Sequence, residues 1–371
     1  MKKKLLIFTF ARSDYGILQN IIKKLNENIN FDVTLVIGSN HLSKKFGNTF
    51  KEIYKNKIKF KKINLNYKFS STNIILDNIA SLISQLSNIF NKMSFHGAII
   101  LGDRYEMFGA SIACKNYDIP IFHLCGGSIT DGSLDNYYRF NISNMSTYHF
   151  VETLSHKKEL IKHNIKKNIF ISGSPSLEFN KKKIISKKIF EKKYNFSFNK
   201  NKIIIACFHP NTKISILENI NDLKILLRFL NNTNDKVIFT YPNADKGFNE
   251  YIKEIKNQLI DKEKNLLVQS LGKFDYFSVL NFSDILIGNS SSGIIESASF
   301  KIPTINLGER QKGRFKVRNV YNSPFNEKKI FQIYNKIINY KSKKIFFSLK
   351  NPYYKKNSSN FIINQIIQFC K

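Results

Sequence analysis

Short apolar runs alternate with longer amphipathic stretches along this chain. An apolar run bounded by turn signals is typical of a strand buried on both faces of a parallel sheet, and the amphipathic stretches have the spacing of helices. The runs are Leu5–Phe10, Val33–Ile37, Ala98–Leu101, Ile119–Leu124, Tyr148–Val151, Ile203–Phe208, Val237–Thr240, Leu266–Val268, Ile285–Ile287 and Thr304–Leu307. The helical stretches include Ile17–Leu25, Ile74–Ile89 and Met107–Asn116. This alternation predicts βαβ units and therefore an α/β fold with parallel sheets.

The alternating pattern occurs twice within 371 residues, which is a comfortable length for two domains. A polar, Lys-rich stretch follows Gly173-Ser174-Pro175 and separates the two halves. We therefore predict a first Rossmann-like domain at residues 1–176 and a second at residues 177–356. By analogy with other two-domain folds of this kind, the closing amphipathic helix at 357–371 is expected to pack back on the first domain.

The chain carries a strong positive charge. It has 59 Lys and Arg against 27 Asp and Glu, which gives a formal net charge of +32. A nucleic-acid-binding surface requires a basic cluster, but here the excess Lys is scattered, with only short runs such as 181–183. We therefore expect no nucleic-acid partner, although the charge favours anionic substrates.

Nothing in the sequence indicates a metal centre, a disulfide framework or a membrane span. The four cysteines form no C-x-x-C pair, and no His or Cys stands at zinc-finger spacing. The basic start Met1–Lys4 precedes an apolar run that is too short for a signal peptide. No window reaches the roughly 20 apolar residues that span a bilayer. We expect a cytoplasmic protein without a structural metal.

Polar residues follow the expected strands, at the edge where open parallel sheets bind ligands. Arg12 stands at a strand-to-helix turn, where an Arg can bind phosphate, but a surface Arg would look the same. Asp103 is either an acid–base group or a helix N-cap. His209 is either a group that changes charge near pH 7 or a structural His. Gly126-Gly127 lets the backbone approach a ligand or marks a plain turn.

The most specific stretch is Gly288–Glu296, in which small hydroxyl residues and glycine open a helix directly after a strand. Hydroxyls, backbone N–H groups and a helix N-terminus together can cradle a diphosphate. A carboxylate would repel phosphate, so Glu296 is expected to bind ribose hydroxyls. Arg310 follows in a basic loop. The alternatives are a Ser-rich capped loop and a solvated basic loop.

Together, these segments resemble the hydrolysing UDP-N-acetylglucosamine 2-epimerases, in particular their bacterial sialic-acid-pathway branch. The matching segments, in family order, are Arg12–Gly16, Gly102–Glu106, Gly126-Gly127, Phe208–Pro210, Tyr241–Asp245, Gly288–Glu296, Pro303–Gly308 and Arg310–Arg314. The resemblance implies two Rossmann-like domains that face each other across a cleft, as in the GT-B fold of many glycosyltransferases. It also implies a dimer or tetramer.

The resemblance implies a two-step reaction that needs no metal and no nicotinamide or other cofactor. Loss of the proton at C2 of UDP-GlcNAc expels UDP and leaves a glycal, and water then adds with inversion at C2 to release N-acetylmannosamine. A C2 proton is weakly acidic, so the first step needs a positioned base. The matched catalytic residues are Asp103, Asp135 and His209. The matched UDP-sugar ligands are Arg12, Arg104, His209, Asn243, Ser290, Ser291, Ser292, Gly293, Glu296 and Arg310.

The chain departs from the family pattern on the sugar side. Where the family commonly has acidic residues around the paired glycines, this sequence has Cys125 and Ser128. Its acidic pair is reduced to Asp135-Asn136, and Phe140 replaces the customary His. A carboxylate lost without replacement would lower the rate by a factor on the order of 10²–10⁴.

Three explanations of these departures stay open at this stage. Asp103 and Asp135 suffice as the acid–base pair, or the substrate is a diacetamido-trideoxy sugar of the legionaminic-acid route. The latter would make the chain a hydrolysing UDP-N,N'-diacetylbacillosamine 2-epimerase. The third explanation is a catalytically weakened relative that still binds UDP-sugars. A glycosyltransferase of the same fold is the alternative from another reaction class.

Overall fold

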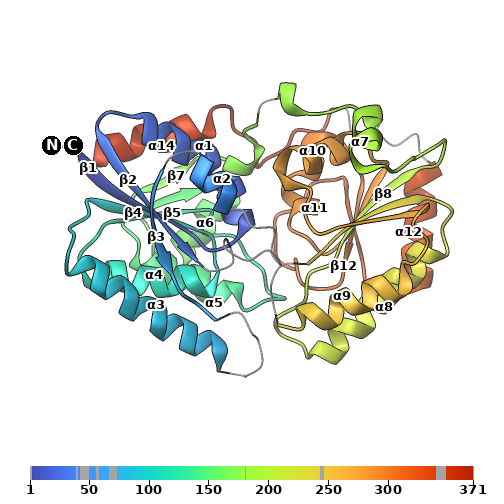
Figure 1. The fold of residues 1–371 in the computed structure, drawn as a ribbon, viewed down its shortest axis with the longest axis horizontal. Helices are drawn as coiled ribbons and strands as arrows, with labels where there is room; N and C mark the ends of the chain where they lie inside the picture. Colours follow the sequence, from blue (N-terminus) through green and yellow to red (C-terminus); the bar gives the residue numbers. More distant parts are fainter. Residues whose placement is uncertain are drawn as a thin grey trace. The chain divides into compact units, whose positions relative to one another are not determined.

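The chain forms two compact units (Figure 1). The computed structural model describes residues 2–38, 41, 50–55, 58–66, 73–179, 181–242, 246–339 and 348–370. Unit 1 comprises Met1–Ile129, Asp135–Glu178 and Pro352–Lys371, and unit 2 comprises Thr130–Leu134 and Phe179–Asn351. Each unit is built around one parallel sheet, which confirms the predicted α/β fold with two Rossmann-like parts. The segment Thr130–Leu134, which the predicted division placed in the first domain, belongs to unit 2.

Unit 1 contains a seven-stranded parallel sheet with the strand order β3-β2-β1-β4-β5-β6-β7. The strands are β1 (Lys3–Thr9), β2 (Phe31–Gly38), β3 (Lys59–Ile63), β4 (Gly97–Leu101), β5 (Ile121–Leu124), β6 (Tyr148–Val151) and β7 (Ile169–Ile171). The central strands β1, β4 and β5 are buried over all or most of their length. Their apolar sequences are therefore explained by helices on both faces of the sheet.

Helices cover both faces of this sheet (Figure 1). They are α1 (Arg12–Glu27), α2 (Phe50–Lys55), α3 (Ile74–Phe90), α4 (Tyr105–Asn116), α5 (Asp135–Met145), α6 (Leu154–Lys162) and α14 (Ser358–Phe369). A 3-10 turn, η3, spans Pro175–Leu177. Helix α4 packs against both α3 and α5, and the closing helix α14 packs against α1. Both ends of the chain therefore lie in unit 1.

Unit 2 contains a six-stranded parallel sheet with the strand order β10-β9-β8-β11-β12-β13. The strands are β8 (Ile203–Cys207), β9 (Lys236–Thr240), β10 (Asn265–Val268), β11 (Ile285–Gly288), β12 (Thr304–Leu307) and β13 (Val320–Ser323). The helices are α7 (Lys187–Tyr194), α8 (Ile216–Asn231), α9 (Phe248–Gln258), α10 (Gly272–Phe282), α11 (Ser292–Ile295) and α12 (Glu327–Asn339), with 3-10 turns η4 (Lys181–Lys183) and η5 (Ser297–Phe300). No helix in the described ranges is both long enough and apolar enough to cross a membrane.

Three strands that the apolar pattern does not predict are β3, β7 and β13, and each lies at the edge of its sheet. In β3, Ile63 is buried and Phe60 is half-buried, while the three Lys residues of the strand are exposed. An edge strand needs no long apolar run, and charged residues there discourage pairing with other chains. The apolar pattern therefore predicts the covered middle of each sheet, whereas among the edge strands it predicts β10 and misses β3, β7 and β13.

Both sheets contain a switch point, where successive connections turn to opposite sides. In unit 1 it lies between β1 and β4, and in unit 2 between β8 and β11. The loops that leave these strand pairs diverge, and open α/β sheets bind their ligands there. Arg12 and Asp103 follow the first strand pair, and His209 and Ser290 follow the second.

Candidate active site

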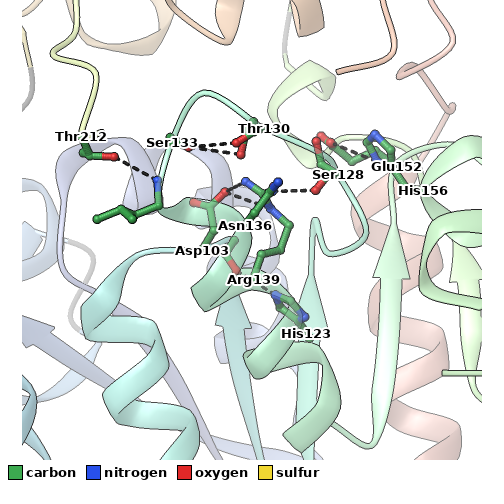
Figure 2. Close-up of polar contacts among 12 residues, drawn as sticks. Asp103, His123, Ser128, Thr130, Ser133, Asn136, Arg139, Glu152, His156 and Thr212 are labelled. Atoms are coloured by element: carbon green, nitrogen blue, oxygen red, sulfur yellow. Dashed lines mark hydrogen bonds and ion pairs between the residues drawn. The ribbon is translucent and has the colours of Figure 1, made fainter. Parts of the chain in front are cut away.

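Asp103 lies at the carboxyl end of β4, beside the switch point of unit 1. Gly102 turns the chain after β4 with a φ of +73°. The Asp103 carboxylate pairs with Arg139 of α5, whose Nε lies 3.1 Å from Oδ2 and whose Nη2 donates to the same oxygen (Figure 2). The Arg139 side chain is fully buried, whereas the Asp103 side chain is 25% exposed. A buried cation therefore holds a carboxylate that stays partly accessible.

The guanidinium of Arg139 has two further partners. Its Nη1 donates to the carbonyl oxygen of Ser128 at 2.6 Å and to Oδ1 of Asn136 at 2.7 Å. A buried charge is costly unless it is paired and hydrogen-bonded, and these contacts meet that requirement. Asn136 adds no charge, so within these contacts Asp103 balances the cation. A cation this close favours the ionised form of Asp103, which is the form that accepts a proton.

His123 of β5 holds the residue before Asp103. Its Nε2 lies 2.8 Å from the carbonyl oxygen of Gly102, and its Nδ1 lies 3.0 Å from Oγ of Ser143. Burial lowers the pKa of His123 to about 4, so the ring is neutral at pH 7. Because a carbonyl only accepts, Nε2 carries the proton and Nδ1 accepts from the Ser143 hydroxyl. The turn that carries Asp103 is thus anchored from two sides.

The paired glycines after β5 are required by close packing. A Cβ on Gly127, which has a φ of +73°, would lie 2.3 Å from the carbonyl oxygen of His156. A Cβ on Gly126 would lie 3.0 Å from the His123 ring. His156 itself lies in the first turn of α6, where its Nδ1 is 3.8 Å from Oε2 of the buried Glu152. This packing accounts for both glycines without a ligand.

Asp135 is the first residue of α5, one turn before Arg139. A carboxylate at this position is stabilised by the helix dipole, and residues four apart share a helix face. Helix α4 begins at Tyr105 with Arg104 as its N-cap residue, so Asp103 precedes the cap position. The alternative that Asp103 is an N-cap is therefore wrong.

The two predicted phosphate ligands of unit 1 occupy the starts of α1 and α4. Arg12 is the first residue of α1, and the N-terminal turn is closed by Asp14, whose Oδ2 accepts from the N–H of Ala11 at 2.9 Å. Arg104 pairs with the buried Glu106 through contacts of 3.1 and 2.9 Å. This bidentate pair fixes the orientation of the Arg104 guanidinium. A phosphate role for either Arg stays a prediction.

In unit 2, the turns after β8 and β11 are joined by Asn289. The strands pair with Gly288 opposite Cys207. Gly288 has a φ of +138°, and a Cβ there would lie 1.8 Å from the Cys207 carbonyl oxygen, so only glycine fits. The side chain of Asn289 accepts from the N–H of His209 at 2.7 Å and donates to its carbonyl oxygen at 2.7 Å. The His209 ring has its Nε2 3.3 Å from Sγ of Cys207.

The Ser-rich stretch forms a single helical turn, α11, followed by η5. Oγ of Ser290 accepts from the N–H of Ser292 at 3.3 Å, and the Tyr276 hydroxyl lies 2.6 Å from Oγ of Ser292. Ser291 is the N-cap residue of this turn. Glu296 is the C-cap residue of α11, just over one turn after the helix begins, and the backbone continues directly into η5.

Gly293 lies inside this short helix, where it packs against the sheet. A Cβ on Gly293 would approach Cγ2 of Thr304 to 2.8 Å. The residue therefore has a packing role in addition to the predicted ligand role. Asn243, the other predicted ligand of unit 2, lies outside the described residues.

Arg310 lies in the loop after β12 and contacts both of these turns. Its Nε lies 3.3 Å from the carbonyl oxygen of Pro210, and its Nη1 lies 3.2 Å from the carbonyl oxygen of Asn289. Nε2 of Gln311 lies 3.0 Å from the same Asn289 oxygen. Unit 2 therefore brings together His209, the start of the Ser-rich stretch and Arg310, as the sequence predicts for a nucleotide site.

The segment Thr130–Leu134 binds to the same part of unit 2. The N–H of Asp131 donates to the carbonyl oxygen of Lys312 at 2.9 Å. The N–H of Leu134 donates to Oγ1 of Thr212 at 3.0 Å, a bond that Figure 2 shows at Thr212. A Cβ on Gly132 would lie 2.0 Å from the carbonyl oxygen of Glu309. The chain directly before Asp135 is therefore fastened to the Arg310 loop and to the turn after His209.

A family model described as UDP-N-acetylglucosamine 2-epimerase matches residues 23–367. The chain belongs to the UDP-N-acetylglucosamine 2-epimerase family. It is 33% identical over 332 residues to the GDP/UDP-N,N'-diacetylbacillosamine 2-epimerase (hydrolyzing) of Campylobacter jejuni, which covers 88% of this chain and 85% of that protein. It is 30% identical over 374 residues to polysialic acid biosynthesis protein P7 of Escherichia coli, which covers 100% of this chain and 95% of that protein.

A solved structure of this epimerase family shares the fold. The UDP-GlcNAc 2-epimerase of Neisseria meningitidis, determined with UDP-GlcNAc bound, superposes with a TM-score of 0.82. The two chains are 18% identical, and the match covers 99% of this chain and 100% of that one. At this identity the likeness shows the fold alone.

Three of the positions at which this chain departs from the epimerase pattern lie around Arg139 and α5. Ser128 contributes its carbonyl oxygen to Arg139, while its buried Oγ has no hydrogen-bond partner among the described residues. Asn136 accepts from Arg139 where an acid would add a second negative charge. Phe140 stacks on His163 with the ring centroids 3.8 Å apart. Arg139 pairs with the Asp103 carboxylate, and the neutral Asn136 brings no second charge to this contact.

Three residues that hold the candidate site were not assigned a role from the sequence. They are His123, Arg139 and Asn289. Asn289 lies within the segment Gly288–Glu296 that carries the family resemblance, and Arg139 lies next to the departure at Phe140, but the sequence does not show the partners of either residue. His123 lies inside the apolar run Ile119–Leu124, and a polar residue in such a run is a signal of a buried hydrogen bond.

Proposed function

We propose that this chain is a hydrolysing 2-epimerase that converts UDP-GlcNAc and water into N-acetylmannosamine and UDP, for the synthesis of nonulosonic acids. The observation that carries the proposal is the Asp103–Arg139 pair at the carboxyl end of β4. A partly exposed carboxylate that a buried guanidinium keeps ionised is suited to accept a proton. Because the chain belongs to a family of 2-epimerases, the proton that we propose to be removed is the one on C2 of the sugar.

In the first step, Asp103 takes the proton from C2 of the sugar. The electron pair of the C2–H bond forms the C1–C2 double bond, and the bond between C1 and the UDP oxygen breaks. Arg139 and His123 act as positioning residues, since one fixes the carboxylate and the other fixes the turn that carries it. The Arg139 charge also keeps Asp103 ionised before the proton arrives.

In the second step, water adds to the glycal. The water oxygen joins C1, and C2 receives a proton on the face opposite to the one deprotonated, which inverts the configuration. We assign this second acid–base role to Asp135, which starts the helix that also carries Arg139. His209 is the further candidate, because an imidazole transfers protons near pH 7.

The departing UDP carries negative charge, and unit 2 supplies the groups proposed to stabilise it. Arg310 would contact the diphosphate as a cation, with Ser290, Ser291 and Ser292 as hydroxyl donors. Arg12 and Arg104 are proposed as further phosphate ligands, and Glu296 as the ligand of the ribose hydroxyls. Asn243 and Gly293 complete the proposed set.

A second candidate substrate is UDP-N,N'-diacetylbacillosamine. The similarity to the Campylobacter jejuni enzyme favours it, and so do the changes on the sugar side at Ser128 and Phe140. Replacing an acidic and a basic side chain by a hydroxyl and an aromatic ring alters what the sugar substituents would meet. The chemistry at C1 and C2 would be the same for both substrates.

The two candidates are separated by one product analysis. The protein is incubated in deuterated water with UDP-GlcNAc and, in parallel, with UDP-N,N'-diacetylbacillosamine, and UDP and the sugar are identified. The proposal expects free N-acetylmannosamine with deuterium at C2. Turnover of the diacetamido sugar alone would select the second substrate. UDP binding without turnover of either sugar would contradict both, as would an unlabelled sugar transferred to an acceptor.

A further inference from the structure

The amide of Asn289 forms a reciprocal pair with the backbone of His209. Its Oδ1 accepts from the His209 N–H and its Nδ2 donates to the His209 carbonyl oxygen, both at 2.7 Å. The Asn289 side chain therefore forms the same pair of hydrogen bonds as a backbone residue in a β-sheet, just beyond the ends of the neighbouring strands β8 and β11. Asn289 is 2% exposed, so these bonds are shielded from water.

The backbone of the same residue holds the Arg310 loop. The carbonyl oxygen of Asn289 accepts from Nη1 of Arg310 at 3.2 Å and from Nε2 of Gln311 at 3.0 Å. Arg310 also reaches the carbonyl oxygen of Pro210, the residue after His209. One residue is thus bonded through its side chain to the β8 turn and through its main chain to the β12 loop.

We propose that Asn289 is a positioning residue that sets His209 and Arg310 in register for nucleotide binding. The inference rests on the proposed function, in which both groups act on a UDP-sugar. A carboxamide is suited to this place because it offers one donor and one acceptor side by side, which matches the N–H and carbonyl of one residue. Serine or alanine at 289 would remove both of these hydrogen bonds to the backbone of His209, which costs free energy.

Unit 1 offers a matched control for a test of this role. Asn78 brackets the backbone of Asn66 in the same way, with its Oδ1 accepting at 2.8 Å and its Nδ2 donating at 2.7 Å, and it is 3% exposed. Asn78→Ala removes the same pair of bonds and, in addition, a 3.2 Å contact from Nδ2 of Asn78 to the Tyr105 hydroxyl, and Asn78 is not itself a proposed ligand. The control therefore loses at least as many hydrogen bonds as Asn289→Ala.

The test compares Asn289→Ala with Asn78→Ala in the full chain. We expect Asn289→Ala to weaken UDP binding in calorimetric titration by about tenfold. A change of this size corresponds to the free energy of a lost buried hydrogen bond. The pKa of His209, followed by NMR of histidine-labelled protein without nucleotide, should also move from its wild-type value. Asn78→Ala should leave both measurements unchanged at an equal or larger loss of melting temperature.

Two results would overturn the proposal. One is an Asn289→Ala protein that binds UDP as tightly as wild type with an unchanged His209 titration. The other is an equal loss of UDP affinity in both variants, which would mean that only general stability matters. Asn289→Ser, with Asn78→Ser as its control, serves if the alanine variant does not fold, because it removes both bonds without adding a charge. The His209 titration needs no turnover, so a failure of the proposed reaction is distinguished from a failure of this inference.

Discussion

The Asp103 carboxylate is paired with the guanidinium of Arg139, and Arg139 is fully buried while Asp103 is not. The pair joins the end of β4 to the first half of α5. Its geometry orients the carboxylate and its charge keeps the carboxylate ionised. The proposed chemistry depends on this relationship, because a base at C2 must be both aimed and unprotonated.

Replacing Arg139 should move the pH dependence of the reaction. Removal of a nearby cation raises the pKa of a carboxyl, so the acid limb of kcat/KM should shift to higher pH in Arg139→Met. Arg139→Lys keeps the charge and should restore part of the shift. We also expect turnover to fall by about 10²-fold in Arg139→Met, as for a misaligned base. Steady-state kinetics between pH 4 and 8 measure both effects.

The matched control for Arg139 is Arg228, which forms an ion pair with Glu327 on the surface of unit 2. Arg228→Lys and Arg228→Met should leave the pH profile in place. An acid limb that stays at the wild-type pH in Arg139→Met would show that Arg139 does not control the base.

Gly132→Ala should weaken nucleotide binding, although Gly132 is not one of the predicted ligands. The added Cβ would lie 2.0 Å from the Glu309 carbonyl oxygen, so the segment must leave the Arg310 loop or the loop must move. We expect UDP affinity to fall by about tenfold, the effect of a strained or overpacked contact of 1–3 kcal/mol. Calorimetric titration with UDP measures it.

Gly109→Ala is the control for this substitution. Its new Cβ would approach only the end of the Leu82 side chain, to 3.1 Å, and that side chain can shift. Wild-type UDP affinity in Gly132→Ala, at normal folding, would mean that the contact of Thr130–Leu134 with the Arg310 loop has no role in nucleotide binding.

The predicted nucleotide site can be tested by truncating its side chains one at a time. Arg310→Ala and Ser290→Ala should each weaken UDP binding, Arg310→Ala by about 10–100-fold because a charge-assisted contact is lost. Arg228→Ala controls for the loss of one positive charge elsewhere in unit 2. Unchanged UDP affinity in both site variants would place the nucleotide elsewhere.

Buried histidines should make the fold sensitive to acid. Burial lowers the pKa of His41 and of His123 to about 4, and that of His149 to about 3, whereas an unfolded chain protonates histidine near pH 6.5. As the pH falls from about 6.5 to 4, the unfolded state binds protons that the folded state does not. Stability should therefore fall in this window, by up to about 1.4 kcal/mol per pH unit for each histidine.

The variant His149→Gln isolates one of these histidines. Its unfolding free energy, measured by denaturant titration at several pH values, should fall less steeply between pH 6.5 and 4 than that of wild type. Equal slopes in the two proteins would show that His149 is protonated equally in the folded and unfolded states.

The strands that could be predicted from the sequence are mainly those whose two faces are covered by helices. The central strands of both sheets appear as apolar runs because helices bury both of their faces. The edge strand β3 is mostly exposed and rich in Lys, so its sequence carries no such signal. The crossing of Thr130–Leu134 into unit 2 depends on long-range packing, which a local pattern does not contain.

The sequence was enough to predict where the candidate site lies, but not which residues contact each other within it. Asp103 and His209 follow strands, and that position alone suggests a ligand-binding edge. Arg139 is 36 residues from Asp103, and Asn289 is 80 residues from His209, so neither contact follows from spacing. The length of the helix at Ser292 was also not predictable, because it ends where the backbone tightens into η5.

The most direct test of the account is Asp103→Asn, assayed for turnover and for UDP binding in the same preparation. We expect deuterium incorporation at C2 and UDP release to fall by about 10²–10⁴-fold, since an amide cannot accept the proton. The affinity for UDP should stay within about threefold of wild type, because the groups proposed to bind the nucleotide diphosphate are intact. Near-normal turnover in Asp103→Asn would contradict the account, because it would remove Asp103 from the reaction.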